Sequence, residues 1–350
     1  MKIGSLCTGY GGLDMAARNV FGGQLAWVSD IEPGPITLLE HHHPGVPNLG
    51  DLKVIDWSAV EPVDILTAGY PCQPFSNAGL RKGTDDPRHI WPYIAYGIDR
   101  LRPRIVVLEN VGAHLKRGFR VVAADLAALG YRVAWTLLRA SDVGAAHRRE
   151  RLFIVAADTS REHDDWPGNV RPGRWAEHPD GGGPAGGLSL LPTPTARDWK
   201  GRNQRDDETC LPGAVFPLLP TPTVGNVTGG NLTRSGARSD EPLLPGVVAQ
   251  ATQGEAVDWQ EYEPAIRRWE SVLGRPAPYP ATRGPRGGVK VAPAFGEWLM
   301  GLPAGWISEV PGLSINEQLK LVGNGVVPQQ AEHAIRWLVD QIATAQAAAA

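Results

Sequence analysis

A cysteine and a glutamate stand where two apolar runs of the sequence end. Cys72 follows the run VDILTAG (63–69) within the stretch GYPCQPFS, and Glu109 lies near the end of the run RIVVLEN (104–110). A cysteine at such a turn can act as a nucleophile once its thiolate is favoured. A buried carboxyl tends to keep its proton and can serve as a general acid. The pair therefore indicates acid-assisted nucleophilic chemistry.

Two arginines add positive charge to this set. Arg149 and Arg151 lie at the start of a third apolar run, RLFIVAA (151–157). Guanidinium groups near a cysteine favour its thiolate. Each residue alone has a simpler explanation, namely a small buried cysteine, a helix-starting carboxylate or surface charge. Their joint occurrence at neighbouring strand ends favours one catalytic site.

These groups suit methyl transfer to carbon-5 of a cytosine ring, a carbon that is too weak a nucleophile unaided. The thiolate of Cys72 would add to carbon-6 while Glu109 protonates ring nitrogen N3. The resulting enamine could attack a sulfonium methyl through carbon-5. Loss of the carbon-5 proton and elimination of the cysteine would then release the product.

The first 158 residues predict a doubly wound α/β sheet that would bring these strand ends together. Continuous apolar runs alternate with helix-like segments, as is typical of parallel strands buried on both faces. The carboxyl ends of such strands converge on one crevice. The last two runs are joined without a helical pattern, so we expect them to pair antiparallel at one edge. The predicted strands are 2–6, 24–30, 63–69, 104–110, 131–138 and 151–157, and the predicted helices are 13–21, 91–101 and 119–130.

A glycine-rich turn between the first strand and the first helix predicts an adenosine-type pocket. Gly9, Gly11 and Gly12 would let backbone N–H groups approach a ligand closely. Asp30 ends the second strand, at roughly the 20-residue offset where an acidic residue meets ribose hydroxyls in Rossmann-type sites. The glycine spacing is not that of a pyrophosphate loop, so S-adenosylmethionine suits it better than a dinucleotide. Asp51 is placed to accept a hydrogen bond from an adenine amino group.

The amino-acid composition of the sequence and its apolar pattern change beyond residue 158. Most of the prolines and many of the glycines lie in 159–293, where apolar periodicity fades. A long segment without element signals is normally functional or disordered, and here the repeated motif LLPTPT argues against pure disorder. Apolar order returns after 294. The sequence then predicts an amphipathic terminal helix with Ala331, Ile335, Leu338 and Ile342 at helical spacing.

The net charge, the length of the apolar stretches and the cysteine count argue against several classes of protein. A net charge of −3 argues against non-specific coating of nucleic acid. No stretch approaches the roughly 20 apolar residues of a membrane span, and the N-terminus lacks a signal-peptide layout. Three widely spaced cysteines make neither a disulfide framework nor a zinc site, and the histidines at 41–43 are interpreted as a solvated helix end. We expect a cytoplasmic protein with no metal and no membrane partner.

Taken in order, these motifs resemble those of the cytosine-5 DNA methyltransferases, in their phage and bacterial form, over nearly the whole chain. The matching stretches are CTGYGGLD, SDIE, GDL, DILTAGYPCQPFSNAGLRKG, VVLENV, GAAHRRERLF and VGNGVVP. The resemblance implies a catalytic and cofactor-binding domain at 1–158 and an inserted target-recognition region at 159–293. It also implies a segment at 294–342 that returns to the catalytic domain, followed by a frayed tail at 343–350.

The resemblance also assigns roles to single residues. Arg151 would hold the cytosine oxygen, with Arg149 in support, and Asn110 would brace the loop that carries the nucleophile. The implied catalytic residues are Cys72, Glu109, Arg149, Arg151, Pro71 and Gln73. The residues implied to bind S-adenosylmethionine are Cys7, Gly9, Tyr10, Gly11, Gly12, Leu13, Asp30, Ile31, Asp51, Leu52 and Asn324.

Double-stranded DNA is the implied partner, and we expect the enzyme to act as a monomer. A base cannot react inside a duplex, so the target cytosine would be flipped out. Ser76, Arg81 and Lys82 would contact the DNA, the two basic side chains binding phosphates, which fix position without reading sequence. Reading of bases would fall to 159–293. The resemblance also suggests that the protein belongs to a restriction-modification context.

The chain departs from the family pattern in three places. Cys7 stands where an aromatic ring usually stacks on the cofactor, and His147 replaces the usual glutamine before the arginines. The arginine-rich lead-in to the stretch MGLPAGW is not recognisable. None of these departures removes a catalytic group, so an active enzyme is expected.

Other classes of protein account for parts of the pattern. An NAD-dependent Rossmann enzyme would explain the glycine turn but not Cys72 together with Glu109. A thymidylate-synthase-like enzyme uses a cysteine on carbon-6 but does not need this cofactor pocket. An RNA cytosine-5 methyltransferase shares the chemistry, and a non-catalytic DNA-binding relative would share the fold.

Overall fold

The computed structural model describes residues 1–71, 90–161, 190–191, 193–196, 211, 214, 257–284 and 289–347. Five predicted site residues lie outside these ranges, namely Cys72, Gln73, Ser76, Arg81 and Lys82. The chain divides into two compact units. The first comprises 1–143, 149–183 and 325–350, and the second comprises 144–148 and 184–324. The functional division of the chain into catalytic and recognition regions stays a prediction.

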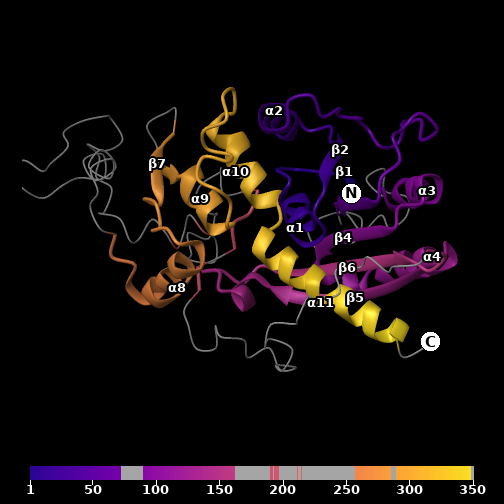
Figure 1. The fold of residues 1–350 in the computed structure, drawn as a ribbon. Coiled ribbons are helices and arrows are strands. Elements are labelled where there is room, and N and C mark those ends of the chain that lie inside the picture. Colours follow the sequence, from indigo (N-terminus) through magenta and orange to yellow (C-terminus); the bar gives the residue numbers. More distant parts are fainter. Residues whose placement is uncertain are drawn as a thin grey trace, which may run out of the picture. The chain divides into compact units, whose positions relative to one another are not determined.

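The first unit is built on a six-stranded sheet (Figure 1). Its strand order is β2-β1-β3-β4-β6-β5, with β1, β2, β3 and β4 parallel and β6 antiparallel to both of its neighbours. The predicted antiparallel pairing of the last two strands is therefore confirmed. The strands are β1 (Lys2–Leu6), β2 (Gln24–Ser29), β3 (Ile65–Gly69), β4 (Ile105–Val111), β5 (Tyr131–Arg139) and β6 (Glu150–Asp158).

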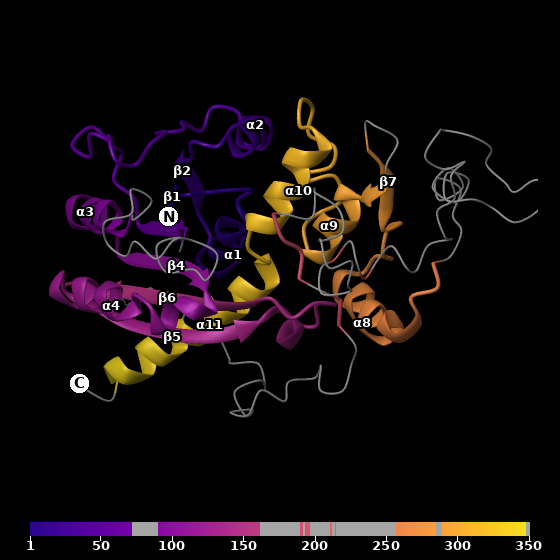
Figure 2. The ribbon, with the colours of Figure 1, turned by 180° about the vertical axis from the view of Figure 1, so that it is seen from behind.

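Helices cover both faces of this sheet, which confirms the doubly wound, Rossmann-like α/β architecture. The C-terminal helix α11 packs on α1, β5 and β6 on the side seen in Figure 1. Figure 2 shows the opposite side, with α3 and α4. The helices of this unit are α1 (Gly12–Phe21), α2 (Pro33–His42), α3 (Trp91–Leu101), α4 (Phe119–Ala128) and α11 (Pro328–Ala347), with short 3₁₀ turns η3 (Gly112–Lys116) and η4 (Ala140–Val143).

The apolar runs are continuous because alternate strand residues enter two separate cores. In β4, Ile105 and Val107 pack with α1 and α11, whereas Val106 and Leu108 face the core that α3 and α4 cover. Successive side chains of a strand point to opposite faces, so a strand buried on both sides needs apolar residues at every position. The four residues predicted for the inner face of the terminal helix are all buried in the first of these cores: Ala331, Ile335, Leu338 and Ile342.

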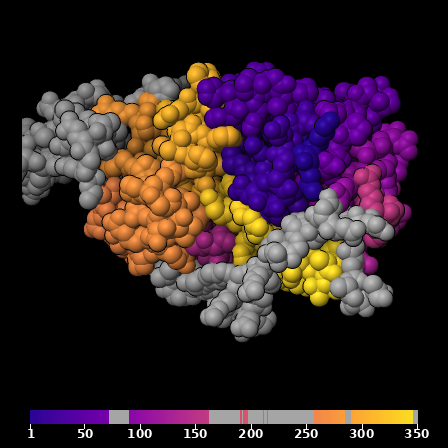
Figure 3. Space-filling model, in the orientation of Figure 1, coloured from indigo at the N-terminus to yellow at the C-terminus, as the bar shows by residue number. Residues whose placement is uncertain are grey.

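The second unit contains a smaller aromatic core. Phe295 stacks between Trp259 and Trp298, with ring centroids 5.5 Å and 5.8 Å away. The indole N–H of Trp269 donates to the carbonyl of Trp298 over 2.9 Å. The described elements are η10 (Gln260–Tyr262), α8 (Glu263–Leu273), β7 (Ala281–Arg283), β8 (Val289–Val291), α9 (Pro293–Leu299) and α10 (Ile315–Asn324). Figure 3 shows the residues of α8, in orange, gathered on one face of this unit.

A buried carboxylate organises the stretch that follows α9. The side chain of Glu297 accepts hydrogen bonds from the backbone N–H groups of Gly305, Ile307 and Ser308, over 2.6, 2.9 and 3.0 Å. Three donors on one carboxylate satisfy a charge that would otherwise be costly to bury.

Among the helices of the described ranges, none is both long and apolar enough to cross a membrane.

Candidate active site

The glycine-rich turn between β1 and α1 takes the backbone shape that glycine permits. Gly9 and Gly11 have φ values of 57° and 81°, in the left-handed region. A Cβ on Gly12 would lie 2.2 Å from the carbonyl oxygen of Val326, so only glycine lets these two backbones meet. A Cβ on Gly9 would meet nothing within 4 Å, which leaves open space over the turn.

Asp30 lies directly beside this turn, as predicted for a ribose-binding residue. Its carboxylate accepts from the backbone N–H groups of Gly9, over 2.9 Å, and Glu32, over 3.0 Å. Burial raises the pKa of Asp30, although both N–H groups act in the opposite direction. The end of β2 is therefore tied to the glycine turn through one carboxylate.

Cys7 stands between two acidic groups. Burial, followed by the negative charges of Asp30 and Asp51, raises the pKa of the Cys7 thiol to about 12. This thiol is therefore neutral at ordinary pH and unsuited to act as a nucleophile. Its surroundings also show that Asp30 and Asp51 belong to one edge of the sheet, as the predicted adenosine pocket requires.

The remaining predicted cofactor residues fall into three groups. Ile31 is 62% exposed, so its side chain is available to an adenine ring. Tyr10, Leu13 and Leu52 are less than a tenth exposed, so their side chains belong to the core and their backbone alone could touch a ligand. Asn324 is exposed at the end of α10 in the second unit.

These features fit S-adenosylmethionine. Two carboxylates offer acceptors for hydroxyl and amino groups, and an exposed isoleucine offers an apolar surface for a purine. The open space over Gly9 allows a ligand to approach the backbone of the turn. No phosphate-binding arrangement is needed, because this cofactor carries none.

Glu109 and Arg151 form a close ion pair at the carboxyl end of β4. Arg151 Nε lies 2.9 Å from Glu109 Oε1, and the two side chains are 16% and 9% exposed. Val111 pairs with Arg151 in the antiparallel register of β4 and β6, which places Glu109 and Arg151 on one face. Burial raises the pKa of Glu109, although Arg151 and Arg149 both act to lower it.

Gly69 lies near both Glu109 and the part of the chain that leads into the glycine turn. A Cβ on Gly69 would lie 3.7 Å from Glu109 Oε2 and 3.8 Å from the carbonyl oxygen of Cys7. Gly69 also pairs with Glu109 across β3 and β4. Since Cys72 follows Gly69 by three residues, the chain leads from this junction directly to the predicted nucleophile. Pro71, the last described residue before it, is exposed.

Arg149 is almost fully buried and bridges to the segment before α11. Its guanidinium donates to the carbonyl of Gly325, and its own carbonyl accepts from the side chain of Gln330 over 2.9 Å. Its φ of 29° is unusual for a residue with a side chain, which indicates local backbone strain. The positive charge of Arg149 acts to lower the pKa of Glu109, and its supporting role in catalysis stays a prediction.

Sequence reasoning missed a buried carboxylate beneath the glycine turn. Asp14 accepts from the hydroxyl groups of Ser5, over 2.9 Å, and Thr67. These residues come from α1, β1 and β3, so the three elements meet at one carboxylate. Burial raises the pKa of Asp14 to about 6. An acidic residue in the first turn after two glycines was the available signal, but its partners depend on the strand order.

Two further residues have structural partners. Asn110 donates through Nδ2 to the carbonyl of Tyr70 over 3.0 Å, which agrees with the predicted bracing of the segment before Cys72. His147 is fully buried in the second unit, and its Nε2 lies 2.9 Å from the carbonyl of Leu299. The hydrogen bond and burial of His147 give it a structural role within that unit.

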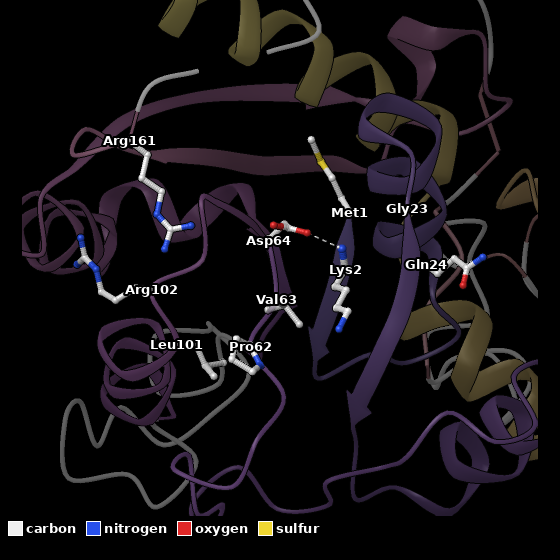
Figure 4. Close-up of a pocket in the computed structure, with 10 residues that line it drawn as sticks. All are labelled: Met1, Lys2, Gly23, Gln24, Pro62, Val63, Asp64, Leu101, Arg102 and Arg161. Atoms are coloured by element: carbon white, nitrogen blue, oxygen red, sulfur yellow. Dashed lines mark hydrogen bonds between the residues drawn. The ribbon is translucent and has the colours of Figure 1, made fainter. Parts of the chain in front are cut away.

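A separate hollow lies at the opposite edge of the first unit (Figure 4). Its volume is about 810 Å³, and the N–H of Lys2 donates to the Asp64 carboxylate over 2.7 Å at its wall. It sits at the amino ends of the strands, whereas ligands of such sheets bind at the carboxyl ends. The lining residues are Met1, Lys2, Gly23, Gln24, Pro62, Val63, Asp64, Leu101, Arg102 and Arg161.

Comparison with known proteins agrees with the geometry at the carboxyl edge. Residues 1–199 match the family of C-5 cytosine-specific DNA methylases. The chain is 34% identical over 163 residues to the Type II methyltransferase M.NlaX of Neisseria lactamica, covering 44% of this chain and 51% of that protein. It is 31% identical over 215 residues to the Type II methyltransferase M.NaeI of Lentzea aerocolonigenes, covering 58% of this chain and 49% of that protein.

The chain thus spans about half the length of these curated relatives. Among solved structures, the Dnmt2 methyltransferase of S. pombe shares 15% sequence identity with a TM-score of 0.55, and the match covers 98% of this chain and 99% of that one. At this identity the likeness concerns the fold. The family match extends over more than half of the 350 residues and includes the glycine turn, Glu109 and both arginines. The chain therefore belongs to the C-5 cytosine-specific DNA methylase family.

Proposed function

We propose that this protein transfers a methyl group from S-adenosylmethionine to carbon-5 of cytosine in duplex DNA. The observation that carries the proposal is the junction at Gly69. Gly69 lies near both the buried Glu109, which pairs with Arg151, and the carbonyl of Cys7, which leads into the glycine turn. Cys72 follows Gly69 by three residues. A nucleophile, an acid and a cofactor turn are the groups that this reaction needs in one place.

Glu109 supplies the proton in the proposed mechanism. Its raised pKa favours a carboxyl that donates to ring nitrogen N3 when the Cys72 thiolate adds to carbon-6. Arg151 then holds the cytosine oxygen, and Arg149 maintains positive charge beside both groups. When carbon-5 takes the methyl group, the demethylated cofactor is the leaving group. Solvent then removes the carbon-5 proton, Cys72 leaves as a thiolate, and the N3 proton returns to Glu109.

The residues at the glycine turn and at the end of β2 would hold the methyl donor. S-adenosylmethionine supplies an electrophilic methyl group on a sulfonium centre. Asp30 binds the ribose hydroxyls and Asp51 the adenine amino group, while Ile31 packs against the purine. Backbone groups of Gly9 and Gly11 would contact the ligand, and the resemblance to the family assigns Asn324 to cofactor binding as well.

The DNA substrate is supported by the family and by the names of the relatives, which are Type II methyltransferases. Such a substrate requires that the cytosine be flipped out of the helix, at a cost of a few kcal/mol. Arg81 and Lys82, together with Ser76, contact the DNA backbone, and 159–293 read the target sequence. The enzyme acts as a monomer in the cytoplasm, in a restriction-modification context.

Methyl transfer to nucleic acid in vitro tests the proposal. Wild-type protein with radiolabelled S-adenosylmethionine should label duplex DNA and leave transfer RNA unlabelled. Bisulfite sequencing of DNA from expressing cells should then show modified cytosines in one sequence context. Cys72→Ala should abolish the mark, whereas the Cys210→Ala variant, whose change lies in the proposed recognition region and not among the proposed catalytic groups, should still modify cytosine. Labelling of transfer RNA alone would assign the enzyme to RNA instead.

A further inference from the structure

Two buried polar side chains connect the strand ends that carry the proposed nucleophile and acid. The hydroxyl of Tyr70 and Nε2 of His114 lie 2.9 Å apart in a hydrogen bond. The two residues are 5% and 3% exposed. Tyr70 is separated from Cys72 by Pro71 alone, and His114 lies in η3, five residues after Glu109. The pair thus links the segments that follow β3 and β4.

A second contact fixes the backbone of the same tyrosine. The carbonyl of Tyr70 accepts from Asn110 Nδ2 over 3.0 Å, and Asn110 Oδ1 accepts from the N–H of Val111 over 2.9 Å. Tyr70 is therefore held both at its backbone and at the far end of its side chain. The two hydrogen bonds reach the same segment that contains Glu109, so they restrain the two strand ends relative to each other.

A third contact joins the residues that flank segment 72–89. The rings of Tyr70 and Trp91 have centroids 5.9 Å apart at an angle of 39°. Trp91 is the first residue of α3, and its indole N–H donates to Asp125 of α4 over 2.8 Å. The end of β3 and the start of α3 therefore pack against each other through these two rings. Both are buried in the core that α3 and α4 cover.

This arrangement is more polar than packing alone requires. Leucine and phenylalanine could fill the same space, whereas a hydroxyl and an imidazole must find partners when they are buried. A hydrogen bond also depends on direction, so it restricts the rotation of the Tyr70 ring in a way that apolar contact does not. Tyr70→Phe retains the ring and removes only the hydroxyl, which makes it a sharp test.

We infer that Tyr70 and His114 are positioning residues, which hold the end of β3, the part of the chain that leads into Cys72, in place relative to Glu109. The inference rests on the proposed function, because it assigns these residues a part in the same reaction. A displacement of about 1 Å between reacting groups can cost roughly 100-fold in rate. Loss of one hydrogen bond behind the nucleophile should therefore lower the rate of the chemical step while cofactor binding is retained.

The experiment compares single-turnover methylation of duplex DNA at saturating cofactor. The variants are Tyr70→Phe, His114→Leu and the double variant, with His114→Gln to restore an acceptor near the position of Nε2. Tyr131→Phe is the matched control, because the Tyr131 hydroxyl is also buried and donates to the carbonyl of Pro103 over 2.7 Å. That bond lies at the amino end of β4, away from Glu109. The KM for S-adenosylmethionine and the unfolding temperature are measured for every variant.

We expect Tyr70→Phe and His114→Leu each to lower the single-turnover rate about 10-fold, with the KM for S-adenosylmethionine within about twofold of wild type. The double variant should be no slower than His114→Leu alone, because the hydroxyl that Tyr70→Phe removes has already lost its imidazole partner there. His114→Gln should recover most of the rate, and Tyr131→Phe should match wild type. Rescue by glutamine separates positioning from a loss of folding.

Two results would overturn the inference. One is a Tyr70→Phe rate equal to that of Tyr131→Phe, and the other is a double variant whose loss equals the product of the single losses. A wild-type protein that methylates no DNA would overturn the proposed function as well. An active wild type with an unaffected Tyr70→Phe variant would overturn the positioning role alone.

Discussion

At the scale of single residues, the site works through groups whose ionisation is set by burial. Glu109 keeps a raised pKa even though two arginines lie near it, because burial in the sheet outweighs their charge. Cys7 is held neutral by burial and two carboxylates. Cys7 is therefore not the nucleophile, and the predicted nucleophile is Cys72, which follows Gly69 by three residues in the sequence.

The opposing influence of Arg151 on Glu109 predicts a change in the pH profile. The reaction needs Glu109 protonated, so kcat/KM should fall as the pH rises through its pKa. Arg151 lowers that pKa, and Arg151→Gln should therefore move the falling limb to higher pH while reducing the absolute rate. Steady-state kinetics over a pH series measures both effects. A falling limb that stays in place, or moves to lower pH, would remove Glu109 from the role of acid.

Asp14 predicts a change in stability with pH. Its pKa is raised from 3.8 in the unfolded chain to about 6 in the fold, so the folded state binds more protons between these values. Its contribution to stability is therefore greatest at acid pH and falls by about 3 kcal/mol as the pH rises through this window. Asp14→Asn removes the titration.

Urea unfolding of wild type and Asp14→Asn at several pH values checks this. The free energy of unfolding of wild type, minus that of the variant, should decrease between pH 4 and pH 6.5, roughly the window of the Asp14 titration. Other carboxyls titrate in both proteins and cancel in the difference. A difference that is flat across the range would show that Asp14 is not buried as the structure has it.

At the scale of elements, hydrogen bonds to buried side chains fix the backbone of segments that the apolar cores do not position. Glu297 of α9 accepts from three backbone N–H groups of the stretch after it. Glu297→Gln should lower the free energy of unfolding of the protein by about 3 kcal/mol, because charge-assisted hydrogen bonds are lost in a buried place. Glu309→Gln is the matched control, since Glu309 is exposed in the same stretch.

Denaturant unfolding followed by tryptophan fluorescence measures this loss, because Trp298 and Trp306 lie near the same stretch in the sequence. Equal stability of the two glutamine variants would contradict the role assigned to Glu297. A larger loss in the Glu297 variant, without a change in the Glu109 pH profile, would agree with a contribution confined to its own unit.

The strands of the sheet could be predicted from the sequence, whereas the order in which they lie side by side could not. Strand β1 matches its predicted range, and the antiparallel pairing of the last two strands followed from the missing helix between them. The insertion of β6 between β4 and β5 has no local signal, because pairing between distant segments depends on the whole sheet. The ion pair between Glu109 and Arg151 depends on that strand order. The two residues could therefore be predicted from the sequence as catalytic candidates, but the contact between their side chains could not.

At the scale of the whole chain, the site residues come from segments far apart in sequence. Arg149 contacts Gly325, and Tyr10 donates to Val326 over 2.8 Å. The terminal segment thus supports the glycine turn from across the chain. The apolar spacing of α11 predicted its buried face, but nothing in that spacing indicated which helix it would meet. The contacts of Tyr70, Asp14 and His114 escaped prediction for the same reason.

The central claim is that Cys72 adds to carbon-6 of the target cytosine. Covalent capture of the enzyme on DNA tests it most directly. A duplex that carries 5-fluorocytosine at the target position cannot lose the carbon-5 substituent as a proton, so the adduct between cysteine and carbon-6 should accumulate in the presence of S-adenosylmethionine. We predict an adduct that mass spectrometry maps to Cys72 in wild type and in Cys210→Ala, and no adduct in Cys72→Ala. An adduct that persists in Cys72→Ala, or a wild-type protein that methylates cytosine without forming one, would contradict the account.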